Sequence, residues 1–132
     1  MEGKCLCGKV VIKAKDVAEF EACHCGMCRR WGGGPLMAFH CGHDVEIEGK
    51  DLVKVFKSSD WAERAFCDSC GTHMYYRFVP ANEFIVPIGL FQDREDYTFA
   101  EQIFIDSKPN FYSFENETIK LTEQQVIEKY SQ

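Results

Sequence analysis

The sequence lacks any long apolar run. None of its hydrophobic segments approaches the roughly 20 residues that a membrane-spanning helix needs, and Lys, Glu or Asp interrupts the longest of them. The first residues, Met1 to Cys5, contain no basic stretch followed by an apolar one, so no secretory signal is expected. We therefore expect a cytoplasmic protein that does not associate with membranes.

Positive charge is also in short supply. The chain has 15 Lys and Arg against 21 Asp and Glu, a formal net charge of -6, whereas general nucleic-acid binding needs a basic surface. Apolar residues are not scarce: 45% of the 132 residues are hydrophobic and eleven are Phe, enough for a core and too many for intrinsic disorder. The length fits a single domain over residues 1–132.

Cysteine is abundant, with eight residues in the chain. Four disulfides would require an oxidising compartment, and no export signal is seen. Cysteines two or three residues apart are poor disulfide partners but good ligands for one metal ion. Thiolates select zinc, while an iron–sulfur cluster and a redox Cys-x-x-Cys pair remain as alternatives. Seven of the eight fall in three tight clusters: Cys5 and Cys7; Cys23, Cys25 and Cys28; Cys67 and Cys70.

The clusters predict two different metal sites. Combining the two pairs gives a closed four-cysteine site, which is typical of structural zinc. The remaining cluster offers three thiolates within six residues, which leaves one tetrahedral position for water or substrate, as in catalytic sites. Two side chains compete for that position. His24 lies between two of the cysteines, although on an extended segment its side chain would point away from theirs. Cys41 follows Cys28 by thirteen residues, and if it is not a ligand it is expected to be a buried free thiol.

Three motifs occur in order: Gly3-x-Cys5-x-Cys7-Gly8-x-Val10; Cys23-His24-Cys25-x-x-Cys28-Arg29-Arg30; and Ser58-Ser59 followed by Arg64-x-Phe66-Cys67-x-x-Cys70-Gly71. This set resembles the glutathione-dependent formaldehyde-activating enzyme family, which includes the centromere-protein-V-like proteins. Its β-tent fold is similar to that of the zinc-binding Rab-exchange chaperones. The resemblance implies a structural zinc on the four paired cysteines and a second, labile zinc on Cys23, Cys25 and Cys28. Cys41 is a departure from the family motif.

Local patterns favour a mainly β fold, β-tent-like, with short antiparallel strands in a sandwich or open barrel around zinc. One helix is expected at the C-terminal end, where Thr122 and Gln125 have capping-box spacing, and a brief helical turn is expected after Cys28. Segments rich in β-branched and aromatic residues predict strands at 10–14, 17–21, 52–56, 73–78, 83–88 and 98–105.

These features lead to a functional hypothesis. A zinc ion on Cys23, Cys25 and Cys28, the predicted catalytic residues, would favour the thiolate form of a substrate, and a thiolate beside an aldehyde forms an S-hydroxyalkyl adduct. We therefore expect a carbon–sulfur lyase acting on a small thiol and an aldehyde, such as glutathione and formaldehyde. Arg29 and Arg30 would bind substrate carboxylates, with Trp31 as a wall of the site. The alternative is a non-catalytic binding module in which both zincs are structural.

Overall fold

The computed structural model describes residues 1–131, which form two compact units, each built from two segments of the chain. Unit 1 comprises residues 1–18 and 38–96, and unit 2 comprises residues 19–37 and 97–131. The described chain has eleven strands and two α-helices, so the prediction of a mainly β fold is confirmed. Four short 3-10 helices complete it: η1 (Lys50–Leu52), η2 (Val79–Ala81), η3 (Ile88–Leu90) and η4 (Ile105–Ser107).

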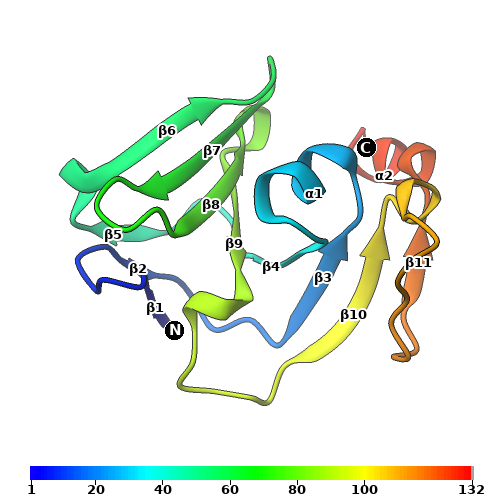
Figure 1. The fold of residues 1–132 in the computed structure, drawn as a ribbon, viewed down its shortest axis with the longest axis horizontal. Helices are drawn as coiled ribbons and strands as arrows, with labels where there is room; N and C mark the ends of the chain where they lie inside the picture. The colour runs from blue at the N-terminus through cyan, green and yellow to red at the C-terminus, as the bar shows by residue number, and fades with distance from the viewer. Residues whose placement is uncertain (132) are drawn as a thin grey trace. The chain divides into compact units, whose positions relative to one another are not determined.

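Unit 1 is built from antiparallel strands, as expected (Figure 1). Its strands form open sheets and not a closed barrel. The smaller sheet has the order β1 (Glu2–Lys4), β2 (Val11–Lys13), β5 (Glu46–Glu48). The larger set has the order β4 (Leu36–His40), β9 (Glu83–Pro87), β8 (His73–Phe78), β7 (Ala62–Cys67), β6 (Val53–Lys57), with β4 entering from unit 2 along the chain.

The core of unit 1 follows the alternation of its strands. Ile12 is fully buried between two half-buried neighbours on β2, and Phe39 on β4 is fully buried as well. The ring of Phe39 meets that of Phe91 edge to face, with centroids 5.6 Å apart. Gly3 on β1 packs so closely on Leu90 that a Cβ at this position would lie 2.9 Å from the Leu90 Cβ.

Gly49 allows the tight connection between β5 and β6, and we expect Gly49→Ala to destabilise the protein by about 2 kcal/mol or more. Its φ is +79°, and a Cβ there would overlap with the carbonyl oxygen of Lys9. Gly89→Ala is the matched control, because Gly89 has ordinary φ and open space around its Cα. Thermal unfolding followed by circular dichroism measures both variants, and equal midpoints would contradict the expectation.

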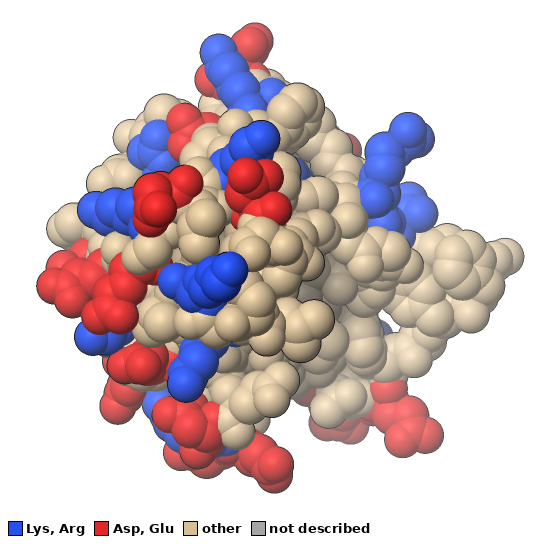
Figure 2. Space-filling view, turned by 60° about the vertical axis from the view of Figure 1, so that its left-hand side comes forward, with Lys and Arg blue, Asp and Glu red and all other residues tan. Residues whose placement is uncertain are grey.

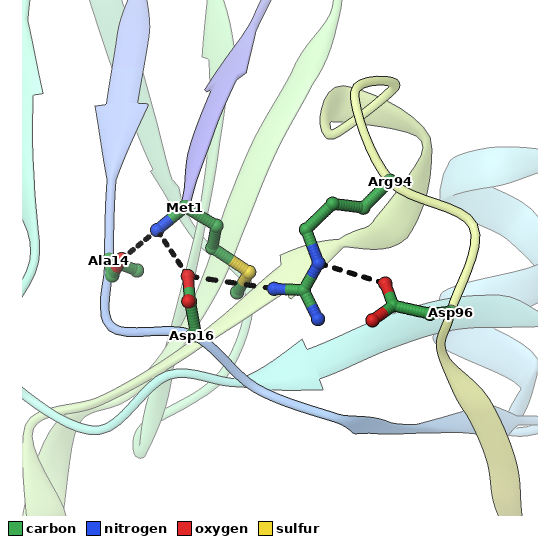
Figure 3. A network of polar contacts seen from close by, with 5 residues as sticks. All are labelled: Met1, Ala14, Asp16, Arg94 and Asp96. Carbon is green, nitrogen blue, oxygen red and sulfur yellow. Dashed lines mark hydrogen bonds and ion pairs between the residues drawn. The ribbon is translucent and has the colours of Figure 1, made fainter.

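A charged network anchors the first strand of unit 1 (Figure 3). The amino group of Met1 donates to the Ala14 carbonyl at 2.6 Å and to the Asp16 carboxylate at 3.0 Å. Arg94 lies 3.5 Å from Asp16 and donates to Asp96 at 2.9 Å. The hydrogen bond from the amino group is the main cause of the lowered pKa of Asp16. The start of β1 and the segment around Arg94 are thereby tied together within unit 1.

Unit 2 departs from the antiparallel expectation, because its three strands pair in parallel (Figure 1). Parallel pairing needs crossover connections of about a dozen residues or more. The link formed by residues 104–118 provides such a crossover before the last strand. In the register of the sheet, Cys23 lies opposite Ile103. The strand order is β3 (Glu19–Cys23), β10 (Thr98–Ile103), β11 (Ile119–Leu121).

Two helices accompany this sheet. Helix α2 (Glu123–Tyr130) begins at Thr122 with the predicted capping box and buries Val126. The sequence predicts a helical turn after Cys28, whereas helix α1 (Gly26–Gly32) begins before Cys28 and includes it. Neither of these helices has the length and apolar character that crossing a bilayer requires. The structure also shifts the strand predicted at 17–21 to Glu19–Cys23 and adds strands that the sequence analysis missed: β1, β4, β5, β7 and β11.

Charged side chains are mixed by sign on the surface. Figure 2 shows acidic and basic groups interspersed over the face drawn. Several form ion pairs, with Lys13 lying 2.8 Å from Glu48 and Arg77 lying 3.0 Å from Glu63. The basic side chains in these pairs are neutralised locally by acidic ones.

Candidate metal centres and active site

The first cysteine cluster lies in unit 1 and brings together the two predicted pairs. The sulfurs of Cys5, Cys7, Cys67 and Cys70 all lie within 4.8 Å of one another. The Sγ atoms of Cys5 and Cys7 are 3.5 Å apart, and those of Cys7 and Cys67 are 3.9 Å apart. Zinc–sulfur bonds of about 2.3 Å place the sulfurs of a tetrahedron about 3.8 Å apart. The donor set and its spacing therefore suit a zinc ion.

Two turns present these sulfurs. After β1, Gly8 adopts a φ of +78° and donates its N–H to the Cys5 carbonyl at 3.0 Å, while the N–H of Val10 donates to the Cys5 sulfur at 3.3 Å. After β7, Gly71 adopts a φ of +79° and donates to the Cys67 carbonyl at 2.7 Å. Each turn is a knuckle in which glycine permits the left-handed conformation.

Thr72 connects the two knuckles, and the sequence analysis missed it. Its hydroxyl accepts a hydrogen bond from the backbone N–H of Leu6 at 3.0 Å and lies 3.2 Å from the sulfur of Cys70. With the Leu6 N–H as donor to its oxygen, the hydroxyl can donate its own hydrogen to that sulfur. This hydrogen bond is the main cause that lowers the pKa of Cys70 to about 5. Thr72 thus favours the thiolate that a metal ion binds.

Burial acts on the cluster in the opposite direction. Cys67 is completely buried, and burial raises the pKa of its thiol to about 11, against the backbone N–H groups of Cys70 and Ser69, which lower it. A buried thiolate needs a positive partner. The four-cysteine cluster therefore has the chemistry of a structural metal site, with a cation expected to hold its sulfurs in their ionised form.

The second cluster lies in unit 2, where β3 ends and α1 begins. The sulfurs of Cys23, Cys25 and Cys28 lie within 4.8 Å of one another. Cys25 is the N-cap of α1, and its sulfur accepts the N–H of Cys28 at 3.3 Å. Cys23 and Cys28 are buried in an apolar cluster with Ile103 and Val126, whereas Cys25 is half-buried. The strand end and the first helical turn together aim three sulfurs at one point.

Electrostatics at this cluster also call for a cation. The pKa of the Cys23 thiol is raised by its hydrogen bonds to the sulfurs of Cys25 and Cys28, and further by burial. Three neighbouring thiols cannot all ionise without positive charge between them. A soft divalent ion bound by all three sulfurs would relieve that repulsion, and zinc fits this donor set.

His24, one candidate for a fourth ligand, is held elsewhere. Its Nδ1 lies 2.7 Å from the Tyr112 hydroxyl, and its Nε2 lies 2.9 Å from the Gln102 side-chain oxygen. Both ring nitrogens are therefore occupied, and the ring is fully buried. The expectation that its side chain points away from the cysteines agrees with this arrangement. Tyr112 and Gln102 were missed by the sequence analysis because no local pattern connects them to His24.

Cys41, the other candidate, is a buried thiol of unit 1. Its sulfur lies 3.9 Å from the carbonyl oxygen of Phe39, and its backbone N–H donates to Phe84 at 2.8 Å. Burial raises the pKa of this thiol to about 12. Cys41 belongs to neither group of sulfurs that could hold a metal ion among the described residues.

The predicted substrate-binding residues follow Cys28 on α1. Arg29 is half-buried and donates from Nε to the carbonyl oxygen of His24 at 3.0 Å. Arg30 is exposed, and Trp31 is half-buried. Successive residues of a helix point about 100° apart, so these three side chains do not share one face of α1. Arg29 has a structural role beside the second cluster in addition to any role with substrate.

Comparisons with known proteins identify relatives of this chain and a solved structure with a similar fold. An uncharacterized lyase of Schizosaccharomyces pombe is 37% identical over 128 residues, covering 96% of this chain and 93% of that protein. A putative glutathione-dependent formaldehyde-activating enzyme of Halomonas elongata is 22% identical, covering 88% of this chain and 82% of that protein. A crystal structure of a Rhodobacter sphaeroides protein, 24% identical, matches the fold with a TM-score of 0.62 over 72% of this chain and 91% of that one.

The family comparison covers both cysteine clusters. The model that describes the glutathione-dependent formaldehyde-activating enzymes matches residues 1–107, which include all seven clustered cysteines. The match ends before Tyr112, so the hydroxyl that meets His24 comes from a segment outside it. With this match over most of its length, the chain belongs to the glutathione-dependent formaldehyde-activating enzyme family.

Proposed function

We propose that this protein is a zinc-dependent carbon–sulfur lyase that forms and cleaves adducts between a thiol and an aldehyde, with glutathione and formaldehyde as its substrates. The observation that carries the proposal is the convergence of three sulfurs, from Cys23, Cys25 and Cys28, while His24 makes hydrogen bonds with both ring nitrogens. Three protein ligands leave one tetrahedral position of a zinc ion for a substrate. The names of the two relatives, a lyase and a putative formaldehyde-activating enzyme, support the same chemistry.

The reaction needs a thiolate at neutral pH. A zinc ion held by Cys23, Cys25 and Cys28 would lower the pKa of a substrate thiol that binds to it. When a thiol adds to an aldehyde, a carbon–sulfur bond forms and the thiol proton ends on the new hydroxyl group; cleavage reverses both changes. Burial of Cys23 and Cys28 among Ile103 and Val126 keeps water away from one side of the cluster.

Substrate carboxylates need cations near the cluster. Glutathione carries two carboxylates, and Arg binds a carboxylate through two parallel hydrogen bonds. Arg29 uses its Nε for His24, which leaves its terminal nitrogens for a ligand. Arg30, exposed on the next position of α1, is the second cation, and Trp31 provides an aromatic wall. All three roles belong to the proposal.

The proposal is tested by removing metal with a chelator and by comparing glutathione with a thiol that has no carboxylate. Three protein ligands would hold a zinc ion less tightly than four and would leave a position open to a chelator, so the second zinc should exchange more readily than a four-cysteine zinc. We expect a mild chelator to remove one zinc per chain and abolish adduct formation from glutathione and formaldehyde, and added zinc to restore both. Mercaptoethanol, which has no carboxylate, should react more weakly than glutathione.

Two results would contradict the proposal. The first is an equal rate of adduct formation with zinc-loaded protein and with buffer alone, measured by the loss of free formaldehyde. The second is equal resistance of both zincs to chelation, which would indicate that no position is open to a substrate and would favour the non-catalytic binding module. Cys41→Ala is the control for thiol chemistry outside the clusters and should keep both zincs and full activity.

A further inference from the structure

A network of hydrogen-bonded polar side chains surrounds His24. Gln102, also buried, donates from its Nε2 to the Thr118 hydroxyl at 2.9 Å, so its oxygen faces His24 as an acceptor. The Nε2 of His24 must then carry the hydrogen, and Nδ1 accepts from the hydroxyl of Tyr112. The aromatic rings of Tyr112 and Phe114 lie 5.5 Å and 6.0 Å from the imidazole. One tautomer and one ring orientation of His24 are selected by its neighbours.

The backbone of His24 is fixed at two further points. Its N–H donates to the carbonyl of Ile103 at 3.1 Å, and its carbonyl accepts from Arg29 at 3.0 Å. His24 is thus held through backbone N–H, carbonyl and both ring nitrogens. Cys23 and Cys25 are the immediate neighbours of His24. These contacts therefore also fix the backbone positions of the two cysteines, from which their side chains extend.

The segment that provides Tyr112 has a fixed shape of its own. The ammonium group of Lys108 donates to the carbonyl oxygens of Pro109 and Tyr112 and to the hydroxyl of Ser113. It also lies 5.1 Å from the centre of the Tyr112 ring. Residues 108–118, which we call the 108–118 loop, therefore present the Tyr112 hydroxyl from an ordered turn.

We propose that Tyr112, Gln102 and Thr118 are positioning residues that act through His24 to hold Cys23 and Cys25 in the geometry that binds metal. The inference rests on the zinc at the three-cysteine cluster that the proposed function requires. None of the three acts as a metal ligand. Tyr112 and Gln102 bind the ring of His24 directly, and Thr118 binds Gln102. The 108–118 loop, outside the family match, thereby becomes part of the metal site of this chain.

Tyr112→Phe tests the hydrogen bond between Tyr112 and His24, because this substitution removes only the hydroxyl. We expect its second zinc to bind 10- to 100-fold more weakly, a range typical for loss of partners that orient metal ligands, with the four-cysteine zinc unchanged. Competition with a chromophoric chelator resolves the two zinc ions of each chain. Cobalt substitution gives a second readout, since the thiolate charge-transfer band of the three-cysteine site should weaken. Phe111→Leu, at the exposed neighbouring position, is the control and should match the unmodified protein.

A second pair of variants tests the other side of the hydrogen-bond network, where Thr118 binds Gln102. This test does not depend on whether Tyr112→Phe folds. Thr118→Val removes the hydroxyl that orients Gln102, and Thr118→Ser retains it; only the valine variant should weaken the second zinc. Unchanged zinc affinity in both Tyr112→Phe and Thr118→Val would overturn the inference, as would equal weakening of both metal sites. If the unmodified protein binds a single zinc, both the proposed function and this inference fail. If it binds two zincs and the variants bind them equally well, only this inference fails.

Discussion

Cys67→Ser is expected to abolish zinc binding at the four-cysteine cluster and to unfold unit 1. Apparent binding energies of structural zinc are roughly 10–16 kcal/mol, which is comparable with the whole stability of a typical domain, about 5–15 kcal/mol. Cys67 is fully buried at the end of β7, and its sulfur lies 3.9 Å from that of Cys7, at the start of the chain. Losing this sulfur would disconnect the two knuckles and leave the thiols of Cys5, Cys7 and Cys70 without a cation.

Metal analysis together with circular dichroism checks this expectation. The zinc content should fall, and the thermal transition of the unmodified protein should be lost or broadened. Cys41→Ser is the matched control, because Cys41 is also a fully buried cysteine of unit 1 but belongs to neither cluster. Burying its hydroxyl should cost only about 1–3 kcal/mol and leave the zinc content unchanged. Equal behaviour of the two variants would mean that the four-cysteine cluster does not support the fold through a metal.

The spacing of the cysteines was enough to predict which sulfurs meet. Cys-x-Cys and Cys-x-x-Cys are short enough for one turn to aim both sulfurs at one point, and glycine follows Cys7 and Cys70 where the turn requires a positive φ. The position of His24, facing away from its neighbours, also followed from the alternation of an extended segment. The capping box at Thr122 was local in the same way and was found in the structure.

Contacts between distant segments could not be predicted from such patterns. The hydrogen bond between His24 and Tyr112 joins residues 88 positions apart, and Thr72 meets Leu6 across 66 positions. The parallel pairing of β3 with β10 likewise depends on where the chain returns and not on the composition of either strand. Strands such as β7, in which Arg64 is buried, lack the simple alternation of apolar and polar residues that would have identified them.

Cys25→Ser is expected to lower the proposed lyase activity by about 100-fold or more while the protein stays folded. Loss of partners that merely orient metal ligands costs about 10- to 100-fold, and loss of a ligand should cost at least as much. Cys25 is half-buried and caps α1 by accepting the N–H of Cys28 through its sulfur. Serine is among the preferred residues at this capping position, so its hydroxyl can accept the same N–H. The substitution therefore removes a thiolate from the cluster without removing the start of the helix.

Cys25→Ala completes the comparison, because alanine can neither bind metal nor cap α1. It should lose the second zinc and the activity as Cys25→Ser does, and in addition lose about 1 kcal/mol of stability through the missing cap. Steady-state rates with glutathione and formaldehyde, zinc content and unfolding midpoints separate the two effects. Both variants should retain the zinc of the four-cysteine cluster, whose ligands all belong to unit 1. Full turnover by the serine variant, with one zinc per chain, would place the reaction away from the three-cysteine cluster.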